Sequence, residues 1–558
     1  MCSEIIDERE QIVVTCGLPY VNGPMHVAHL RTYVPADMYV RFLRKLGKRI
    51  VFVCGSDTHG SPITVEAERR GIKPKQLVEI YHEHYQRLFE ELSVEFDNYG
   101  STDDPINHRL AQDFVRANMK KGLIYPKEAE FPYCPKEERF LPDRYVVGVC
   151  PHCGTANVRG DECDIGCGRY LAPGEILDPH CAICRTPAVM KRRTHYFFRL
   201  SAFSDFLKSY LKHLRGTQIA TKYALTWLRA GLRDWCITRD LYWGVKFPDE
   251  TDLVVYVWWD APIGYISSTI EWSKKKGGDW EHNWKGKGKI VHFIGPGIIY
   301  HHCLFWPSML KGADFNLPWA IVSSAAVKIE DKPFSKTRGN VVWVEEDFLK
   351  MGFETDSLRY YILSYTDHTR DLNFSWQGYQ AKVNGELVAT LGNFVYRTLV
   401  FTHRHWGRVP EGKLDDQVKE KIDETISRVT RQVVRYHFKR AIDDVLNLAS
   451  FGNKYLQDHK PWDLVKTDRA KCADVIYNCL QITKALAILF EPIMPKKAEL
   501  LWRQLGEKGS IHDARIDESL EALKPNKLTR PHTLFPKVSD EKIESITRVM
   551  QRRLKSNR

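Results

Sequence analysis

The pattern of apolar and polar positions predicts alternating strands and helices near the start of the chain. Residues 11–16 form a short β-branched run, residues 25–46 carry apolar side chains at helical spacing, and residues 49–54 form a second apolar run. A strand, a helix and a strand in this order predict a βαβ unit, with a ligand crevice at the carboxyl ends of its parallel strands. Further strand-like runs lie at residues 253–258, 289–294 and 320–323.

This alternation is broken at two places. A stretch rich in Cys, Pro and Gly runs from about residue 123 to residue 191, so we expect an insertion that splits one α/β domain into two halves. From about residue 379 onward, long amphipathic patterns replace the strand signals, which predicts a helical bundle. Its first apolar stripe consists of Val383, Leu387, Leu391, Phe394 and Val395.

Composition narrows the class of protein. The chain has 558 residues, 43% hydrophobic and 27% charged, which is typical of a globular protein with several domains. Residues 1–10 are acidic without an apolar signal core, and there is no run of 18 apolar residues, so we expect a cytoplasmic protein outside the membrane. The net charge of +12 favours a polyanionic partner such as nucleic acid, although many enzymes of this size are mildly basic.

Cysteine spacing predicts a metal site. Half of the 14 cysteines fall between Cys134 and Cys184, several in close pairs, whereas disulfide proteins spread their cysteines through a small secreted chain. Close pairs of this kind are typical of structural zinc. The expected first site consists of Cys150, Cys153, Cys163 and Cys167, although three residues separate its second pair and only two separate its first.

A second zinc site is also possible on spacing. It would use Cys134, Cys181 and Cys184 with one non-thiolate ligand, for which Glu137 and His180 are the candidates. Because a module with so few apolar residues needs metal to fold, the expected role of Zn²⁺ is structural.

Two histidines and a lysine are candidates for phosphate binding. His26 and His29 stand three apart at the expected start of the first helix, where free N–H groups and the helix dipole favour an anion. The alternative is a pair of surface or capping histidines. Lys336 lies in a loop that contains glycine and could place an ammonium against a leaving pyrophosphate, or it could be a solvated surface lysine.

These residues lie in segments that resemble the signatures of class I aminoacyl-tRNA synthetases. PMHVAHL at residues 24–30 resembles their HIGH signature, and PFSKTRGN at residues 333–340 resembles their KMSKS loop. The resemblance implies that His26, His29 and Lys336 act in catalysis and that ATP binds with Mg²⁺. It implies an ATP site formed by His26, His29, Gly295, Ser335, Lys336 and Thr337.

The two signatures depart from the family pattern at a few positions. Val27 and Ala28 replace the usual Ile-Gly, Pro333 replaces the first lysine of the loop, and Thr337 replaces its final serine. Losing that lysine removes one cation near ATP, so we expect redistributed phosphate contacts and an active site.

Five further segments resemble the methionine-specific members of this family. They are LPYVNG at 18–23, CGSDTHGSP at 54–62, DWCITRD at 234–240, VWWDAPIGY at 257–265 and YHHCLFWP at 300–307. The resemblance implies that Asp57 pairs with the ammonium of methionine. It implies a side-chain pocket formed by Leu18, Tyr20, Trp258, Ala261, Pro262, Tyr265, Ile298, His302 and Trp306. Aromatic edges suit a polarizable thioether, although core packing is the alternative for each ring singly.

For Arg239 and for residues 296–297, the sequence allows two alternative interpretations each. Arg239 resembles a family arginine near the reaction centre, and a structural salt bridge is the alternative. Relatives usually carry lysine and aspartate where this chain has Pro296 and Gly297, and that aspartate is thought to hold the ribose of ATP. Ribose binding must therefore be rebuilt from backbone groups or weakened.

The helical end resembles the anticodon-binding bundle of the methionine enzymes. Asn393 and Arg397 stand four apart on an expected helix, and Trp462 follows later in the chain. The resemblance implies that the first two hydrogen-bond anticodon bases and that Trp462 stacks on one, so tRNA(Met) is the implied partner. The alternative is a solvated helix face.

We therefore expect a doubly wound, parallel-sheet (Rossmann-like) α/β catalytic domain with a zinc-knuckle insertion, followed by an all-α helical bundle. The expected divisions are the first catalytic half (1–122), the insertion (123–235), the second half (236–322), the KMSKS-loop and stem-contact region (323–376), the anticodon-binding domain (377–535) and a basic tail (536–558).

The implied activity is that of a monomeric methionine-tRNA ligase. It activates L-methionine with ATP and charges tRNA(Met). One alternative is a class I enzyme for leucine, isoleucine or valine, although those carry a larger editing insertion. The other is a paralogue that binds tRNA without activating methionine, motivated by Pro333, Pro296 and Gly297.

Overall fold

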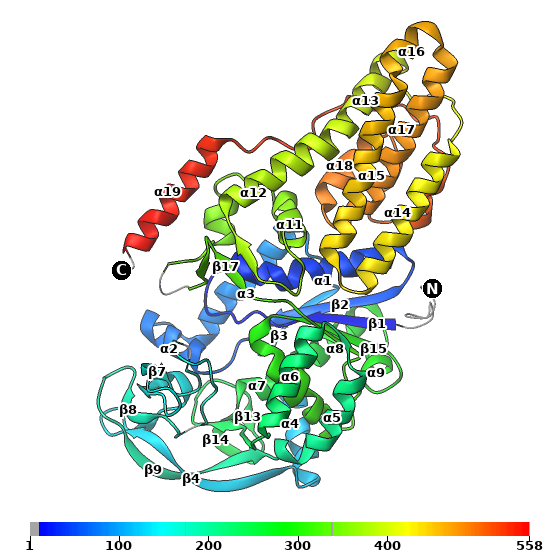
Figure 1. Cartoon of the computed structure of the whole chain (residues 1–558). Coiled ribbons are helices and arrows are strands. Elements are labelled where there is room, and N and C mark those ends of the chain that lie inside the picture. Colours follow the sequence, from blue (N-terminus) through cyan, green and yellow to red (C-terminus); the bar gives the residue numbers. More distant parts are fainter. Residues whose placement is uncertain (1–10, 164, 173, 336–338, 557–558) are drawn as a thin grey trace.

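The computed structural model describes residues 11–163, 165–172, 174–335 and 339–556. An α/β body lies at the centre of the molecule, the strand-rich insertion lies at one end, and a bundle of long helices projects from the other (Figure 1). The predicted fold class is therefore confirmed.

The central sheet has six parallel strands in the order β10-β16-β15-β1-β2-β3. They are β10 (Arg215–Gly216), β16 (Ala320–Ser323), β15 (Lys289–Ile294), β1 (Gln11–Cys16), β2 (Arg49–Ser56) and β3 (Asn98–Ser101). The chain runs outward from β1 to β3 on one side and from β15 to β16 on the other. In doubly wound sheets ligands bind where the order reverses, which here is between the carboxyl ends of β1 and β15.

Apolar side chains bury both faces of this sheet. Ile12, Val14 and Cys16 of β1 point to one core, and Val13 points to the other. The helices around the sheet are α1 (Val27–Lys45), α2 (Ser61–Arg70), α3 (Pro74–Glu91), α4 (Pro105–Lys120), α8 (Gly264–Lys276), α9 (Trp280–Trp284) and α10 (Trp306–Gly312). A strand covered on both faces needs a continuous apolar run, which is what the sequence predicted.

The strands of the predicted insertion begin at Ile124 and end at Cys236, because β11 pairs with β9. They are β4 (Ile124–Cys134), β5 (Arg139–Phe140), β6 (Val146–Val149), β7 (Ala156–Arg159), β8 (Leu177–Cys181), β9 (Val189–Phe198) and β11 (Trp235–Cys236). After β9, the helices α5 (Ser204–His213) and α6 (Gln218–Ala230) pack with the main domain, and β10 joins the central sheet. Buried Leu207 and Leu211 belong to the same core as the sheet, which explains why this part returns to it.

The predicted strand at residues 253–258 is wrong at its end. Strand β14 (Glu250–Val255) stops at Val255 and pairs with β12 (Thr238–Arg239) and β13 (Lys246–Phe247). Trp258 lies in the short helix α7 (Val257–Asp260) that follows. The apolar run is long enough for either structure, so its periodicity did not mark the turn.

The second half of the chain links the sheet to the bundle. Three short strands, β17 (Val327–Ile329), β18 (Lys332–Pro333) and β19 (Leu372–Phe374), form one sheet, and α11 (Thr355–Ser364) lies between the last two in the chain. The helical segments that follow are α12 (Trp376–Lys382), the π-helix η6 (Val383–Gly392), α13 (Asn393–His405), α14 (Asp416–Val434), α15 (Phe438–His459), α16 (Pro461–Thr467), α17 (Arg469–Phe490) and α18 (Pro495–Gln504). The predicted stripe from Val383 to Val395 is buried throughout.

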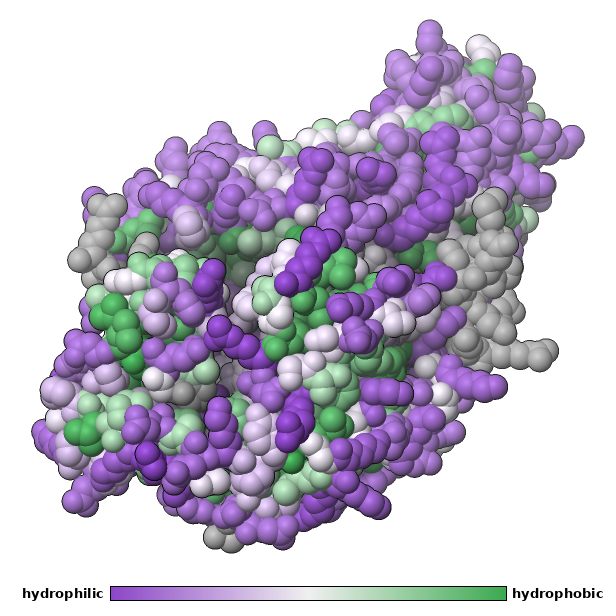
Figure 2. Space-filling model, turned by 60° about the horizontal axis from the view of Figure 1, so that its bottom comes forward, coloured by the Kyte–Doolittle hydropathy of each residue, from purple (hydrophilic) through white to green (hydrophobic). Residues whose placement is uncertain are grey.

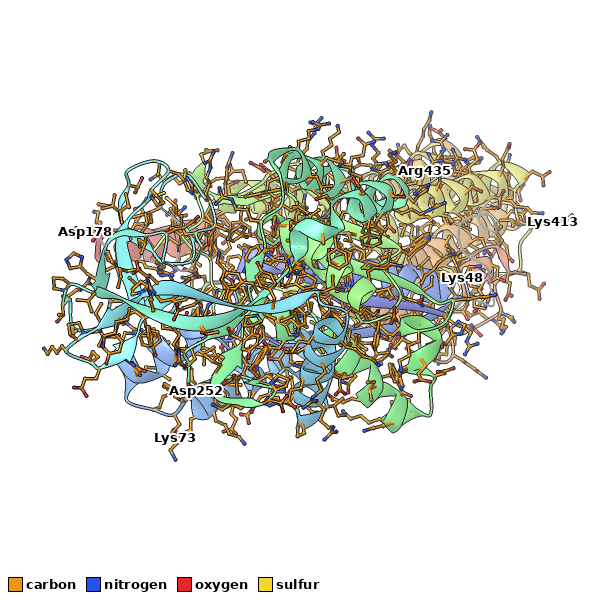
Figure 3. The ribbon with its side chains drawn as sticks, turned by 90° about the horizontal axis from the view of Figure 1, so that it is seen from below. Lys48, Lys73, Asp178, Asp252, Lys413 and Arg435 are labelled. Carbon is orange, nitrogen blue, oxygen red and sulfur yellow. The ribbon has the colours of Figure 1, made fainter. Side chains whose placement is uncertain are left out.

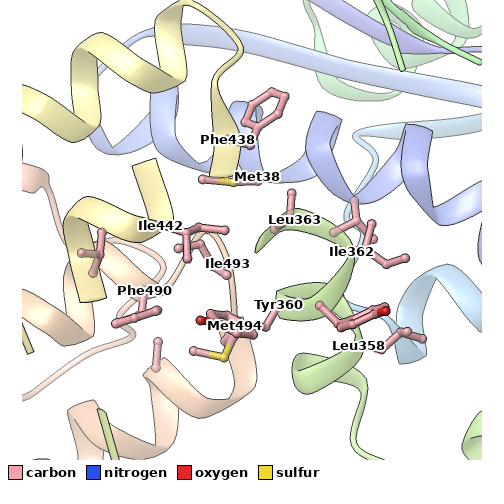
Figure 4. Packing of buried hydrophobic residues seen from close by; sticks show 14 of the residues in the cluster. Met38, Leu358, Tyr360, Ile362, Leu363, Phe438, Ile442, Phe490, Ile493 and Met494 are labelled. Carbon is pink, nitrogen blue, oxygen red and sulfur yellow. The ribbon is translucent and has the colours of Figure 1, made fainter. Parts of the chain in front are cut away.

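One apolar core is shared by the catalytic domain and the bundle. Figure 4 shows Met38 of α1 close to Leu363 of α11 and Phe438 of α15. All three are buried and belong to the cluster that also covers one face of the sheet. The bundle is therefore packed onto the helix that begins at His26.

The predicted tail (536–558) contains a packed helix within its described residues. Helix α19 (Asp540–Ser556) lies apart from the bundle and against the segment that contains α12 (Figure 1). Trp376 Nε1 donates to Met550 Sδ at 2.9 Å. Apolar residues such as Ile546, fully buried, explain why this basic helix returns to the body.

The face of the molecule seen in Figure 2 is mostly hydrophilic, with apolar residues scattered across its middle. Charged side chains such as Lys73, Asp178 and Lys413 lie at the outer rim of the molecule (Figure 3). By length and composition α17 could cross a membrane, but 89% of its most apolar window is buried inside the protein. Its apolar side chains form the centre of the bundle.

Candidate active site and metal centres

The two signature segments, about 300 residues apart in sequence, are in contact. Val27 N donates to Val342 O at 3.0 Å, and Val344 N donates to Met25 O at 3.0 Å. The ring of Phe334 lies 4.4 Å from that of His26. This pairing holds Phe334 and residues 342–344 against the amino end of α1.

His26 and His29 form the start of α1 together. Their rings stack with centroids 3.6 Å apart, and His26 N donates to His29 Nδ1 at 3.2 Å. A neutral His29 ring that accepts at Nδ1 carries its proton on Nε2, where it can serve as a donor. The first turn contains no acidic residue. The geometry therefore suits an anion, as the sequence predicted.

The lysine loop is described only in part. Ser335 N donates to Asn340 O at 3.0 Å, which closes its base. Lys336 and Thr337 lie outside the described residues. Gly295, at the end of β15, leaves open space on the side of α1, where an added Cβ would meet only Thr32 Oγ1, at 3.9 Å.

Helix α19 contacts the segment that follows this loop through Arg553. Arg553 Nη1 donates to Val341 O at 3.0 Å and to Asp347 Oδ2 at 2.8 Å. The same carboxylate accepts from Trp343 N at 2.8 Å. Sequence reasoning missed this contact, because the spacing of a basic helix does not indicate its acidic partner.

Asp57 follows β2 and lies beside the turn after β1. Val21 N donates to Asp57 O at 3.1 Å, and Asp57 N donates to Pro19 O at 2.9 Å. The side chain is buried, and among the described residues its Oδ1 has no hydrogen-bond partner. Burial, with a smaller effect of Asp260, raises the pKa of Asp57 well above its ordinary value. A buried carboxylate with an unused oxygen is suited to a cationic ligand.

Tyr265, His302 and Ile298 form one hydrogen-bonded group. His302 Nδ1 donates to the carbonyl of Ile298 at 2.9 Å, so its Nε2 accepts from Tyr265 Oη at 2.7 Å. Burial lowers the pKa of His302 to about 4, which keeps the ring neutral. The group is uncharged and largely apolar, as a thioether requires.

A second chain of hydrogen bonds was not predicted. Trp306 Nε1 donates to His292 Nε2 at 3.2 Å, and His292 Nδ1 lies 2.5 Å from Thr15 Oγ1. The His292 ring is 4.7 Å from that of Tyr265. His292 and Thr15 are polar residues within apolar strands, and a buried polar group in such a run needs a partner. That signal could have pointed to them.

The other residues predicted to form the methionine pocket lie after the carboxyl ends of β1 and β15 and in the region of α7 and α8. Leu18 is the nearest neighbour of a Cβ added at Gly264, at 2.7 Å, and Ile298 is the nearest at Gly17, at 2.8 Å. Trp258 stacks on His301 with ring centroids 3.7 Å apart. Ala261 and Pro262 are buried between α7 and α8, and Tyr20 Oη donates to His59 O at 2.5 Å.

Arg239 forms the salt bridge that was its alternative role. Its Nε lies 2.9 Å from Asp143 Oδ1, both side chains are buried, and its guanidinium lies 4.0 Å above the Tyr256 ring. Nearby, Tyr170 of the insertion donates to the carbonyl of Gly297 at 2.9 Å. The backbone carbonyl of Gly297, in the segment that differs from the family pattern, therefore already accepts a hydrogen bond. A Cβ added at Gly297 would meet no described atom within 4 Å.

The first predicted cysteine group assembles. Sulfurs of Cys150, Cys153, Cys163 and Cys167 lie within 4.8 Å of one another. Cys150 and Cys167 are 3.8 Å apart at Sγ, and Cys153 and Cys163 are 3.6 Å apart. Thiolates around a tetrahedral ion with 2.3 Å bonds are separated by about 3.8 Å, and a disulfide by about 2 Å. The group therefore can hold a metal ion, and Gly166, whose Cβ would meet Thr155 Oγ1 at 2.4 Å, accommodates the extra residue.

The second group brings three thiolates together. The sulfurs of Cys134, Cys181 and Cys184 also lie within 4.8 Å of one another, and the Sγ atoms of Cys134 and Cys184 are 3.5 Å apart. Neither expected fourth ligand belongs to the group among the described residues. His180 Nδ1 bonds to Asp178 O at 2.9 Å, and the Glu137 carboxylate lies 3.9 Å from Arg139.

The predicted anticodon residues gather at one end of the bundle. Asn393 is exposed on α13, and its Nδ2 donates to Asn453 Oδ1 at 3.3 Å. The guanidinium of Arg397 lies 5.6 Å from the Trp462 ring centroid. Both side chains are half-buried, which leaves surface available to a ligand.

Comparison with known proteins identifies relatives over nearly the whole chain. Residues 12–399 match the family described as tRNA synthetases class I (M), and residues 408–553 match the anticodon binding domain of methionyl tRNA ligase. The methionine–tRNA ligase of Methanosarcina acetivorans is 55% identical, over 98% of this chain and 77% of its own. That of Methanothrix thermoacetophila is 52% identical, over 98% and 82%.

A solved structure is similar in fold. Mycobacterium tuberculosis methionyl-tRNA synthetase, in complex with methionyl-adenylate, matches with a TM-score of 0.79 at 24% identity, covering 94% of this chain and 100% of that chain. From the two contacting signatures, the matched domains and these relatives, the chain belongs to the methionine–tRNA ligase family of class I aminoacyl-tRNA synthetases.

Proposed function

We propose that the chain activates L-methionine with ATP and transfers it to the 3′-terminal adenosine of tRNA(Met), for initiation and elongation. The observation that carries this proposal is the contact of the start of α1, at His26 and Val27, with Phe334 and Val342 of the second signature region. The buried carboxylate of Asp57 lies after the neighbouring strand β2, beside the turn that follows β1. The site thus combines an anion-binding helix start with a cation-binding group.

In the first step, the methionine carboxylate attacks the α-phosphorus of ATP. A new O–P bond forms, the P–O bond between the α- and β-phosphates breaks, and pyrophosphate leaves. His26, His29 and the amino end of α1 stabilise the charge on the phosphates, with Lys336 as the proposed cation on the leaving group. Asp57 holds the ammonium, while Tyr265 and His302 line the side-chain pocket.

In the second step, a hydroxyl of the terminal ribose attacks the methionyl carbonyl. The ester forms, the mixed anhydride breaks, and AMP leaves. Tyr170 reaches Gly297 from the insertion, so the same module that would approach the acceptor end touches the segment next to β15. We propose that this backbone contact helps to replace the absent lysine and aspartate.

We propose that Zn²⁺ fills the first cysteine group and a second ion the group of three thiolates. Among the described residues, the core of the insertion contains ten buried hydrophobic residues, of which four are cysteines, and Leu241 and Val254 of the adjoining domain pack against them, so apolar burial alone is small there. Exposed hydrophobic side chains on the same module, such as Leu177 and Met190, contribute little to its folding.

Replacing Cys163 with serine is expected to remove one equivalent of zinc and unfold the insertion. Elemental analysis should show the loss, and limited proteolysis should cut within residues 124–198, because metal binding and folding are coupled. Cys472→Ala, a buried cysteine of α17, is the matched control and should keep the full zinc content. Equal zinc contents in the wild type and Cys163→Ser would contradict the assignment.

Replacing Trp462 with alanine is expected to raise the KM for tRNA(Met) about 5- to 150-fold, since a stacked base contributes about 1 to 3 kcal/mol. Methionine-dependent pyrophosphate exchange should be unchanged, because Trp462 lies on α16, outside the catalytic domain. Trp280→Ala is the control, a half-buried tryptophan of α9 that also lies under a cation, Lys285. Parallel losses in both assays would count against anticodon binding.

We propose that the protein acts as a cytoplasmic monomer. The alternative function, tRNA binding without activation, is favoured by Pro296 and Gly297, which cannot supply the side chains that relatives use. Pyrophosphate exchange distinguishes the two, because a binding-only paralogue would still retain tRNA.

A further inference from the structure

Two histidines and an aspartate meet on the far side of the loop that carries Asp57. His59 follows β2, Asp103 precedes α4, and His108 lies in the first turns of α4. Asp103 Oδ1 is 3.5 Å from His59 Nε2 and 3.4 Å from His108 Nε2. One ligand atom from each residue lies within 4.8 Å of the others.

A buried carboxylate fixes the orientation of His59. Its Nδ1 donates to Asp260 Oδ2 at 2.6 Å, and both side chains are almost wholly buried. Because Nδ1 is engaged with Asp260, Nε2 is the ring nitrogen that remains for a cation, and it lies 3.5 Å from Asp103 Oδ1. Histidines that ligate metals usually donate their other nitrogen to a carboxylate in this way.

The separations fit ligands around a shared cation better than hydrogen bonds. Within the described part of the chain, neither His59 Nε2 nor His108 Nε2 has a hydrogen-bond partner. An N–H···O bond is about 2.7 to 3.2 Å long. Nitrogen and oxygen ligands of a tetrahedral ion with bonds of about 2.1 Å stand about 3.4 Å apart, which is the spacing found here.

We propose that His59, Asp103 and His108 bind a first-row transition cation such as Zn²⁺, with the fourth position open to water. Two imidazoles and one carboxylate suit such a cation. Asp103 is 26% exposed and His108 33% exposed, so the ion can enter from solvent, whereas His59 and Asp260 form the closed inner wall. The ion would tie the loop of Asp57 to the start of α4.

The experiment is a Co²⁺ titration of the full chain, first treated with a chelator that removes labile ions and leaves the thiolate sites loaded. Wild type is expected to bind one further equivalent of Co²⁺, with d–d absorption and without the sulfur-to-cobalt charge-transfer band. Asp103→Asn and His108→Gln should lose this equivalent. His282→Gln, a half-buried histidine of α9, should keep it.

Three results would overturn the proposal. The first is a wild type that binds no further equivalent, and the second is a His108→Gln protein that binds it unchanged. The third comes from ¹⁵N spectra of the wild-type imidazoles in Zn²⁺, which require no variant. Both nitrogens of His59 protonated would mean that an imidazolium bridges Asp103 and Asp260 in place of a metal.

Discussion

Replacing Asp57 with asparagine is expected to lower kcat/KM for methionine about 10³-fold, on the order of 4 kcal/mol. The carboxylate is buried with one oxygen unused by the protein, so a substrate ammonium would be its main partner. Truncating one member of a buried charge pair costs about 2 to 5 kcal/mol, because the other charge is left without compensation. Methionine-dependent pyrophosphate exchange measures this, and the KM for ATP should change little.

The control is Asp104→Asn. Asp104 caps α4 through its hydrogen bond from Ile106 N, and asparagine caps a helix equally well. Activity should be retained there. A loss of less than about tenfold in Asp57→Asn would show that the ammonium is held by another group.

The same carboxylate predicts a pH dependence. Burial raises the pKa of Asp57 well above 3.8, and only the ionised form pairs with an ammonium. We therefore expect kcat/KM for methionine to fall as the pH drops through this raised pKa, with an acid limb above the usual range of a carboxylate. The limb should disappear in Asp57→Asn.

Replacing Glu491 with glutamine is expected to lower the free energy of unfolding by about 3 kcal/mol. Glu491 joins the bundle to α1: its carboxylate is 2.7 Å from Arg41 Nη1, 2.7 Å from His512 Nδ1 and 3.4 Å from Lys45 Nζ. Burial opposes its charge, but the hydrogen bond from His512 and the charges of Arg41 and Lys45 outweigh it and lower its pKa from 4.5 to about 2. That difference corresponds to about 3 kcal/mol.

Urea denaturation measures the change, with Glu95→Gln as the control. Glu95 pairs with the same Arg41 at 2.8 Å but is 60% exposed, so its loss should cost less than about 1 kcal/mol. Similar losses in both variants would show that burial does not strengthen the contact with Glu491.

The stability gap between wild type and Glu491→Gln should also depend on pH. Because the pKa of Glu491 is lower in the folded protein, its carboxylate stabilises the fold fully above pH 4.5, the unfolded value. This stabilisation is lost as the pH falls through about 2. Glu491 raises the pKa of His512 above 6.5, and that contribution is lost as the pH rises through the raised value. The gap should therefore be widest between pH 4.5 and 6.5.

Fold class could be predicted because the strands at residues 11–16 and 289–294 are buried on both faces and read as apolar runs. The same holds for the stripe from Val383 to Val395. Strand β10 could not be predicted, since two residues carry no periodicity and its pairing with β16 depends on the fold around it.

Site residues within motifs could be named, but their partners could not. Sequence similarity pointed to Arg239 and Trp306, yet Asp143 and His292 lie in other elements, and only tertiary packing brings them together. The cysteine group was predictable because its four ligands lie within 18 residues of one another. The His59 cluster joins a residue after β2 to two residues at the start of α4, about 45 residues later, so spacing alone gave no signal.

The most direct test is exchange of labelled pyrophosphate into ATP, with methionine, leucine, isoleucine or homocysteine as the amino acid. We expect exchange with methionine, its loss in Lys336→Ala, and its retention in Lys332→Ala, an exposed lysine of β18. No exchange from folded, zinc-replete protein that still binds tRNA(Met) would contradict the proposed activity and identify a binding-only paralogue.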